Sequence, residues 1–174
     1  MRFRLGKSGE PPPKPTPAML RVMPRSLLSI STALTLGRSS TLFPRWMGAK
    51  IEAKHDITSG RLVLMWLLSR FGEMRMGAAA QMLDLTPRAI TGQVDGLEDD
   101  GLAQRRASEE DGRVVYVSLT DKGSALISRI EPDLTESFTS LFSCLEKSEM
   151  RELIRITEKL TDHMKAQLDD ASGD

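Results

Sequence analysis

A single apolar stripe in the middle of the chain gives the clearest structural pattern. Ile90, Val94 and Leu97 recur at i, i+4 and i+7, the spacing that places side chains on one face of an α-helix. At about 100° per residue, the positions between them point away from this stripe. The outward face is short, polar and contains glycine; its members are Arg88, Thr91, Gly92, Asp95 and Asp99.

The ends of this helix are marked by capping residues. Thr86 suits the N-cap, because its hydroxyl can accept a bond from a free backbone N–H, and Pro87 suits the first helical position. Gly101 ends the helix as a C′ residue would. Residues 76–83 predict a shorter helix just before it, joined by a turn at 84–85. Together they predict a helix-turn-helix.

Two strand-like runs follow, at residues 102–106 and 113–119. In the second run Val115 and Val117 alternate with Val114 and Tyr116, a period of two that is typical of a strand. The intervening loop contains an Asp-Gly pair, a hairpin signal. The sequence therefore predicts a two-stranded β-wing. A narrow, polar helix face beside such a wing can enter the major groove of DNA, about 12 Å wide.

Two glycines inside the helix allow two interpretations. Gly92 and Gly96 each cost about 1 kcal/mol relative to alanine. Either DNA approaches the backbone closely at these positions, or a neighbouring helix packs there. For Gly92 we favour close approach of DNA. For Gly96 the two interpretations are equally supported.

The chain from about Ile57 to Gly123 resembles the winged helix of the multiple antibiotic resistance regulator (MarR) family. The resemblance rests on Leu83-x-Leu-Thr-Pro-Arg-Ala-Ile-Thr-Gly at the helix-turn-helix, Asp111-Gly-Arg in the wing and Leu119-Thr-x-x-Gly after it. One departure is Gly96, where the family often has arginine, so one phosphate contact is lost. The resemblance implies a homodimeric DNA-binding repressor, less often an activator, relieved by a small ligand or an oxidant.

We expect ten residues to form the DNA-binding surface: Thr86, Pro87, Arg88, Thr91, Gly92, Asp95, Arg105, Arg106, Asp111 and Arg113. Arg88 can pair with guanine, and Thr91 can contact a thymine methyl or a phosphate. Asp95 can accept from cytosine or steady Arg88. Arg113 would enter a minor groove, with Asp111 bonded to its guanidinium or to the wing backbone.

The fold class that follows is mainly α (α+β), with long helices flanking the winged helix-turn-helix. Residues 61–71 are a continuous apolar run that periodicity alone leaves ambiguous between helix and buried strand; the resemblance favours helix. We expect a basic, proline-rich arm at 1–18, which is either an unimportant tail or an arm that contacts DNA. An N-terminal dimerisation helix follows at 19–56, kinked near Pro44, and the DNA-binding lobe occupies 57–119. We expect C-terminal dimerisation helices at 120–168 and a frayed tail at 169–174.

The flanking helices carry apolar faces that a small winged helix does not need for its own core. We expect a second copy to cover them, with intramolecular packing as the alternative, at Leu27, Leu28, Leu34, Leu153, Ile156 and Leu160. Between these helices and the lobe, an apolar cleft could hold an aromatic acid or phenol, which is where the resemblance puts such ligands. Its candidate residues are Trp46, Met47, Trp66 and Met74, each of which core packing also explains.

Charge divides unevenly along the neutral chain. Residues 1–60 hold ten basic and three acidic side chains, residues 61–120 hold seven and nine, and residues 121–174 hold seven and twelve. The DNA-binding lobe is therefore not basic overall, although phosphate contacts supply much of the affinity of DNA-binding proteins. This acidity keeps a second function open, a winged helix that serves as a protein-interaction or architectural module without a ligand response.

Other chemistry finds little support in the sequence. The two histidines, His55 and His163, lack further ligands for a metal, and we expect both at the surface. Cys144, the single cysteine, lies in a helical context without a base, so a buried structural role is favoured over a redox switch. No catalytic triad, phosphate loop or apolar run of about 20 residues occurs. We therefore expect no enzyme activity, no cofactor, no membrane partner and a cytoplasmic location.

Overall fold

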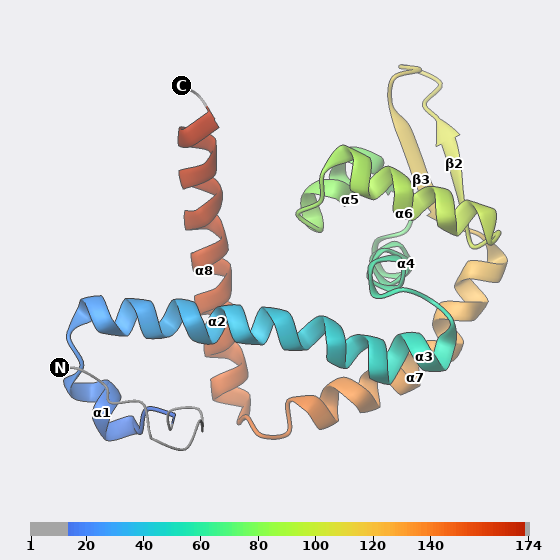
Figure 1. The fold of residues 1–174 in the computed structure, drawn as a ribbon. Coiled ribbons are helices and arrows are strands. Elements are labelled where there is room, and N and C mark those ends of the chain that lie inside the picture. Colours follow the sequence, from blue (N-terminus) through green and yellow to red (C-terminus); the bar gives the residue numbers. More distant parts are fainter. Residues whose placement is uncertain (1–13, 173–174) are drawn as a thin grey trace. The chain divides into compact units, whose positions relative to one another are not determined.

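The computed structural model describes residues 14–172, and the chain divides into two compact units, 1–47 and 48–174. Figure 1 labels the helices and strands of both units. The first unit contains α1 (Pro17–Val22) and α2 (Arg25–Met47). The second contains the remaining elements in chain order: a π-helical turn η1 (Gly48–Glu52), α3 (Ala53–His55), α4 (Ser59–Phe71), β1 (Met74–Arg75), α5 (Met76–Met82), α6 (Pro87–Asp99), β2 (Ala103–Ala107), β3 (Val115–Leu119), α7 (Asp121–Leu141) and α8 (Lys147–Ser172).

The first unit corrects two expectations about the N-terminal segment. The proline-rich arm was expected to lack helix to residue 18, yet Pro17 opens α1, since Thr16 accepts a bond from the backbone N–H of Met19 at 3.3 Å. Residues 1–13 of the arm lie outside the described residues. Pro44 was expected to kink or split the N-terminal helix, and it does not split it, because α2 runs from Arg25 to Met47. The π-helical turn follows one turn after this proline.

The second unit is built on α4, whose helical state settles the ambiguity of the apolar run at 61–71. Its buried side chains are Leu62, Leu64, Met65, Leu67 and Leu68. They share the core with the apolar stripe of α6, with Val117 of β3 and with Ile127, Ile130 and Leu134 of α7. Thr58 occupies the N-cap position of α4, but its hydroxyl makes no capping bond, and the carboxylate of Glu52 accepts the N–H of Ser59 at 2.5 Å.

The wing belongs to a three-stranded antiparallel sheet in the order β1-β3-β2. The hairpin of β2 and β3 was expected. The third strand was not: it is only two residues long, and pairs Met74 with Val117 and Arg75 with Tyr116. Two residues carry no detectable periodicity, so the sequence could not reveal this strand. Figure 1 shows the tip of the hairpin extending past α5 and α6.

The C-terminal helices follow the expected order with shifted ends. Thr120 caps α7 by accepting a bond from the N–H of Gly123 at 3.1 Å, and this helix ends at Leu141. Fraying was expected from residue 169, but α8 remains helical to Ser172. Within the described chain, no helix is both long enough and apolar enough to cross a membrane.

Candidate nucleic-acid interface

The helix α6, which we call the recognition helix, is fixed at both ends by the predicted residues. The hydroxyl of Thr86 accepts a bond from the N–H of Ala89 at 3.2 Å, and Pro87 occupies the first helical position. Gly101 follows the helix with φ of 69°, a left-handed conformation that favours glycine. The helix buries its predicted stripe and leaves its N-terminal half exposed.

The exposed face of the recognition helix keeps donors available at its start. Arg88 is exposed, and its side chain has no hydrogen bond or ion pair with any residue in the range 14–172. Thr91 is exposed, and its hydroxyl donates to the carbonyl of Pro87 at 2.7 Å. Gly92 is exposed, and a Cβ built there would meet nothing within 4 Å. This stretch of helix is thin enough for close approach by a ligand.

At Gly96 the structure supports packing against a neighbouring helix over close approach of DNA. A Cβ at this position would lie 1.8 Å from Nη2 of Arg61, so the guanidinium of Arg61 occupies the space above the helix backbone. Arg61 also pairs with Asp100 at 2.9 Å. This arginine of α4 thereby crosses the recognition helix and holds its C-terminal end.

Arg105 lies against the recognition helix rather than free for DNA. Its guanidinium contacts the Asp95 carboxylate at 2.6 Å and the Thr91 carbonyl at 3.1 Å, and its backbone N–H donates to Glu98 at 2.7 Å. A second bond joins its side chain to Glu98. Asp95 was expected to read cytosine or steady Arg88. In the structure this carboxylate pairs with Arg105, because β2 runs beside the helix.

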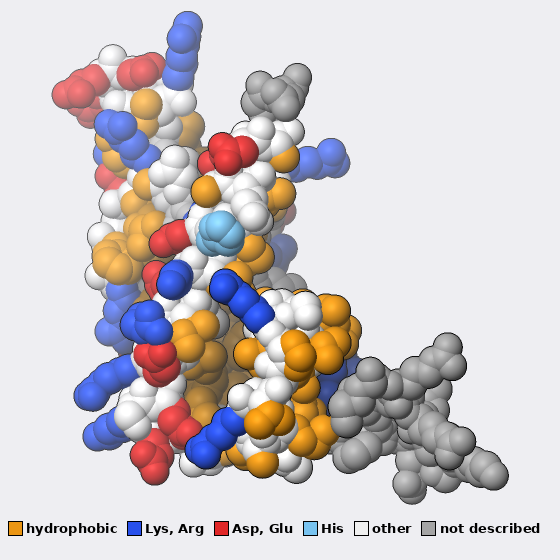
Figure 2. All heavy atoms as spheres, turned by 90° about the vertical axis from the view of Figure 1, so that its left-hand side faces the viewer, with side chains coloured by type: hydrophobic (Ala, Val, Ile, Leu, Met, Phe, Trp, Pro, Cys, Tyr) orange, Lys and Arg blue, Asp and Glu red, His pale blue; other side chains and the backbone are white. Residues whose placement is uncertain are grey.

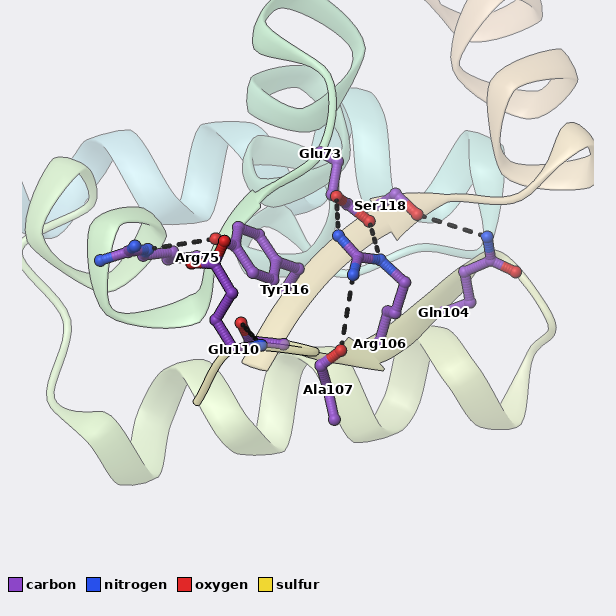
Figure 3. A network of polar contacts seen from close by, with 9 residues as sticks. Glu73, Arg75, Gln104, Arg106, Ala107, Glu110, Tyr116 and Ser118 are labelled. Carbon is purple, nitrogen blue, oxygen red and sulfur yellow. Dashed lines mark hydrogen bonds and ion pairs between the residues drawn. The ribbon is translucent and has the colours of Figure 1, made fainter. Parts of the chain in front are cut away.

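Arg106 is also engaged within the chain. Its guanidinium makes two bonds to the carboxylate of Glu73, at 3.1 and 2.7 Å, and lies 4.9 Å from the ring centre of Tyr116 (Figure 3). These bonds hold the pKa of the Glu73 carboxyl below its usual value. Of the basic residues expected at the DNA, Arg105 and Arg106 are thus the two whose charges are already neutralised.

The wing loop is ordered by its own side chains. The Asp111 carboxylate accepts the backbone N–H of Arg113 at 3.0 Å, one of the two bonds expected of it. The hydroxyl of Ser108 accepts the N–H groups of Glu110 and Asp111 at 3.3 and 3.4 Å. Arg113 is exposed, and its guanidinium makes no hydrogen bond or ion pair with residues 14–172. The loop therefore presents one unpaired arginine from a braced turn.

One arginine near the wing was missed by sequence reasoning. Arg75 is exposed at the end of β1, and its Nε donates to the hydroxyl of Tyr116 at 3.4 Å. No signal in the sequence pointed to it, because its position depends on pairing with a strand about forty residues away.

The residues expected to line a ligand cleft are divided between the two units. Trp46 stacks on Phe43 with ring centres 6.1 Å apart, and Met47 is buried, both in the first unit. Trp66 and Met74 belong to the second unit. Trp66 is 43% exposed on α4, with the guanidinium of Arg70 5.7 Å from its ring centre. The cleft itself stays a prediction.

The residues expected at a dimer interface are exposed apolar side chains in the single chain. Leu27, Leu28 and Leu34 of α2 are 42%, 38% and 65% exposed, and Leu153 and Ile156 of α8 are 44% and 48% exposed. Leu160 is half-buried. Figure 2 shows such hydrophobic side chains open at the surface among charged ones.

Two expectations about reactive residues are corrected. Cys144 was expected to be buried in a helix, but it is exposed in the turn after α7, which ends at Leu141. His55 was expected at the surface, yet its side chain is 10% exposed and lies 3.0 Å from the carboxylate of Asp133. Lys54 also pairs with Asp133, at 2.7 Å, and the contacts with Lys54 and His55 lower the pKa of the Asp133 carboxyl. Residues 14–172 contain no cluster of side chains suited to a metal ion.

Together, a capped recognition helix, a braced wing and a three-stranded sheet define a winged helix-turn-helix protein. The model of the MarR family matches residues 57–115. The HTH-type transcriptional regulator PecS of Dickeya dadantii (strain 3937) is 30% identical over 131 residues, which are 72% of this chain and 78% of PecS. The chain belongs to the MarR family. Its curated relatives are transcriptional regulators, which agrees with the expectation that it is not an enzyme.

Solved structures show the same fold. A mutant MarR from E. coli in complex with operator DNA superposes with a TM-score of 0.68 at 18% identity, covering 79% of this chain and 99% of MarR. BpsR of Bordetella bronchiseptica, whose DNA binding is regulated by 6-hydroxynicotinic acid, gives a TM-score of 0.67 at 19% identity, covering 75% of this chain and 98% of BpsR.

Proposed function

We propose that the chain is a sequence-specific regulator that binds double-stranded DNA, acts as a repressor in the cytoplasm, and works as a homodimer on a pseudo-palindromic operator. This proposal rests on two exposed arginines, Arg88 at the start of the recognition helix and Arg113 in the wing. Neither side chain makes a hydrogen bond or ion pair with residues 14–172. These are the positions from which a winged helix reads a major and a minor groove.

The neutralisation of two arginines in the lobe supports binding to a specific DNA sequence over general attraction to DNA. Arg105 and Arg106 are neutralised by carboxylates. Few cations therefore remain for phosphate contacts, and these contacts supply most of non-specific binding. We expect weak binding to arbitrary DNA and a strong dependence on the bases that Arg88 and Thr91 contact.

The homodimer is supported by the exposed apolar side chains of α2 and α8. Large apolar side chains left in water weaken a single chain's solubility, and a contiguous set of them is typical of an interface. A twofold dimer presents two recognition helices to successive major grooves, about 10–10.5 bp apart. The operator should then be a pseudo-palindrome of roughly 16–20 bp.

The effector we propose is a small aromatic or phenolic ligand that contacts Trp66 of α4. The exposed ring of Trp66 offers an apolar surface, and the guanidinium beside it, that of Arg70, is already paired with Glu131. A hundredfold loss of operator affinity requires the ligand to favour a misaligned state by about 2.7 kcal/mol, which burial of one aromatic ring can supply.

A specific observation also favours the second function, a winged helix that binds another protein. The wing loop carries Glu109, Glu110 and Asp111, and two arginines of the lobe are neutralised. Selection of bound duplexes from a random DNA pool separates the two functions. Enrichment of a pseudo-palindrome supports the regulator. Failure to enrich any sequence, with no salt-dependent DNA binding, supports the protein-binding module.

A further inference from the structure

The sheet beside the wing carries a row of three side chains that lie next to one another on neighbouring strands. Arg75 of β1 pairs in register with Tyr116 of β3, which pairs in register with Arg106 of β2. Residues opposite one another in adjacent strands share a face of the sheet. The two guanidinium groups lie 5.9 and 4.9 Å from the Tyr116 ring centre, within the range of cation–π contacts (Figure 3).

The two arginines of this row differ in how their donors are used. The guanidinium of Arg106 donates two bonds to the Glu73 carboxylate and a third, at 3.5 Å, to the Ala107 carbonyl. Arg75 uses only Nε, on the Tyr116 hydroxyl. Its two terminal nitrogens have no partner among residues 14–172, and no carboxylate lies within ion-pair distance of it.

The position of Arg75 places these free donors close to the wing. Tyr116, its neighbour across the sheet, follows Arg113 by three residues, a separation of about 10 Å along an extended strand. The carboxylates of Glu110 and Asp111 are near enough to contribute to raising the pKa of Arg75, although the Tyr116 hydroxyl contributes most. Figure 3 shows Glu110 of the wing loop on the same side of the sheet as Arg75 and Tyr116.

We infer that Arg75 is a phosphate-binding residue at the base of the wing, oriented by Tyr116, and that it takes the role that the sequence assigned to Arg105 and Arg106. A guanidinium that is already oriented binds phosphate oxygens with two parallel bonds. With Arg113 in the minor groove, the backbone that borders this groove passes the base of the wing. Arg75 contacts a phosphate there and fixes the position of the wing without reading bases.

This inference rests on the proposed function, and the experiment distinguishes the two. The affinity for the duplex chosen by selection is measured by fluorescence anisotropy at several salt concentrations between about 50 and 200 mM. The variants are Arg75→Gln, Arg75→Lys and a neutral control, the double variant Glu73→Gln with Arg106→Gln. Thermal melting by circular dichroism is recorded for each variant.

Arg75→Gln should make the negative slope of log K against log salt less steep by about 0.9, the value for one phosphate contact, and weaken binding about tenfold at all sequences. Arg75→Lys should keep the wild-type slope, because the charge remains. The double control should keep it as well. A wild-type slope in Arg75→Gln overturns the inference, as does an equal loss of slope in the double control. Absence of any DNA binding by the wild-type chain would instead refute the proposed function.

Discussion

Nη2 of Arg105 lies 2.6 Å from Oδ1 of Asp95, so the strand after the recognition helix holds that helix by its exposed face. The same guanidinium donates to the Thr91 carbonyl in the preceding turn. Arg105 therefore fixes the position of the helix that carries Arg88.

Replacing Arg105 by glutamine should destabilise the fold and weaken DNA binding without changing the salt dependence. The side chain is 26% exposed, and loss of its bonds to charged partners should cost about 1.5–3 kcal/mol of unfolding free energy. Urea denaturation measures this cost, and salt titration of DNA binding measures the slope. A negative slope that becomes less steep by about 0.9 would show that Arg105 contacts a phosphate after all.

Arg113→Ala should cost about 1–3 kcal/mol of binding free energy and leave folding intact. The guanidinium has no partner in the described chain, so its removal breaks no internal bond. Narrow, A·T-rich minor grooves attract arginine, so the loss should be largest for operators with such flanks. Anisotropy titration checks the prediction; wild-type affinity in this variant would exclude the wing arginine from the interface.

Arg88→Ala should relax the preference for one base pair in each half-site. Arg88 is exposed at the first turn of the recognition helix, from which a bidentate pair with guanine can form. Selection from a random pool, repeated with the variant, compares the preference at each position. A uniform loss of affinity at every sequence would make Arg88 a phosphate contact instead.

Gly92→Ala should separate stability from DNA binding. A Cβ at this position meets nothing within 4 Å, so the substitution should stabilise the helix by about 1 kcal/mol. If DNA approaches the backbone there, operator affinity should fall while the melting temperature rises. Unchanged affinity would mean that Gly92 is not at the interface. Gly96→Ala is the matched comparison, because its Cβ would displace the Arg61 guanidinium from its place over the helix.

Much of the winged helix could be predicted from local sequence, because its signals act over a few residues. Thr86 and Pro87 cap and start the recognition helix within one turn, and the Asp111 carboxylate bonds the backbone two residues later. The apolar stripe of the recognition helix likewise identified its buried face. In each case the interacting groups are neighbours in sequence.

The contacts that the sequence could not reveal join residues that are distant along the chain. The pairing of Arg105 with Asp95 depends on where β2 lies beside the recognition helix, and the pairing of Arg106 with Glu73 spans 33 residues. Charge sign and position along the chain therefore mark both arginines as candidates for DNA, while packing decides that their donors are used internally. Arg75 was missed because the sequence does not show which of its donors are used. In the structure only its Nε is bonded, to the hydroxyl of Tyr116 on a distant strand.

The central claim is that a twofold dimer reads two half-sites with two recognition helices, and one titration tests it most directly. Affinity is measured by anisotropy for the duplex chosen by selection and for the same duplex with 5 bp inserted at its centre. Five base pairs turn one half-site by about half a helical turn away from its partner's face. The account predicts that the inserted duplex binds no better than a scrambled one. Equal affinity for the original and inserted duplexes would contradict it.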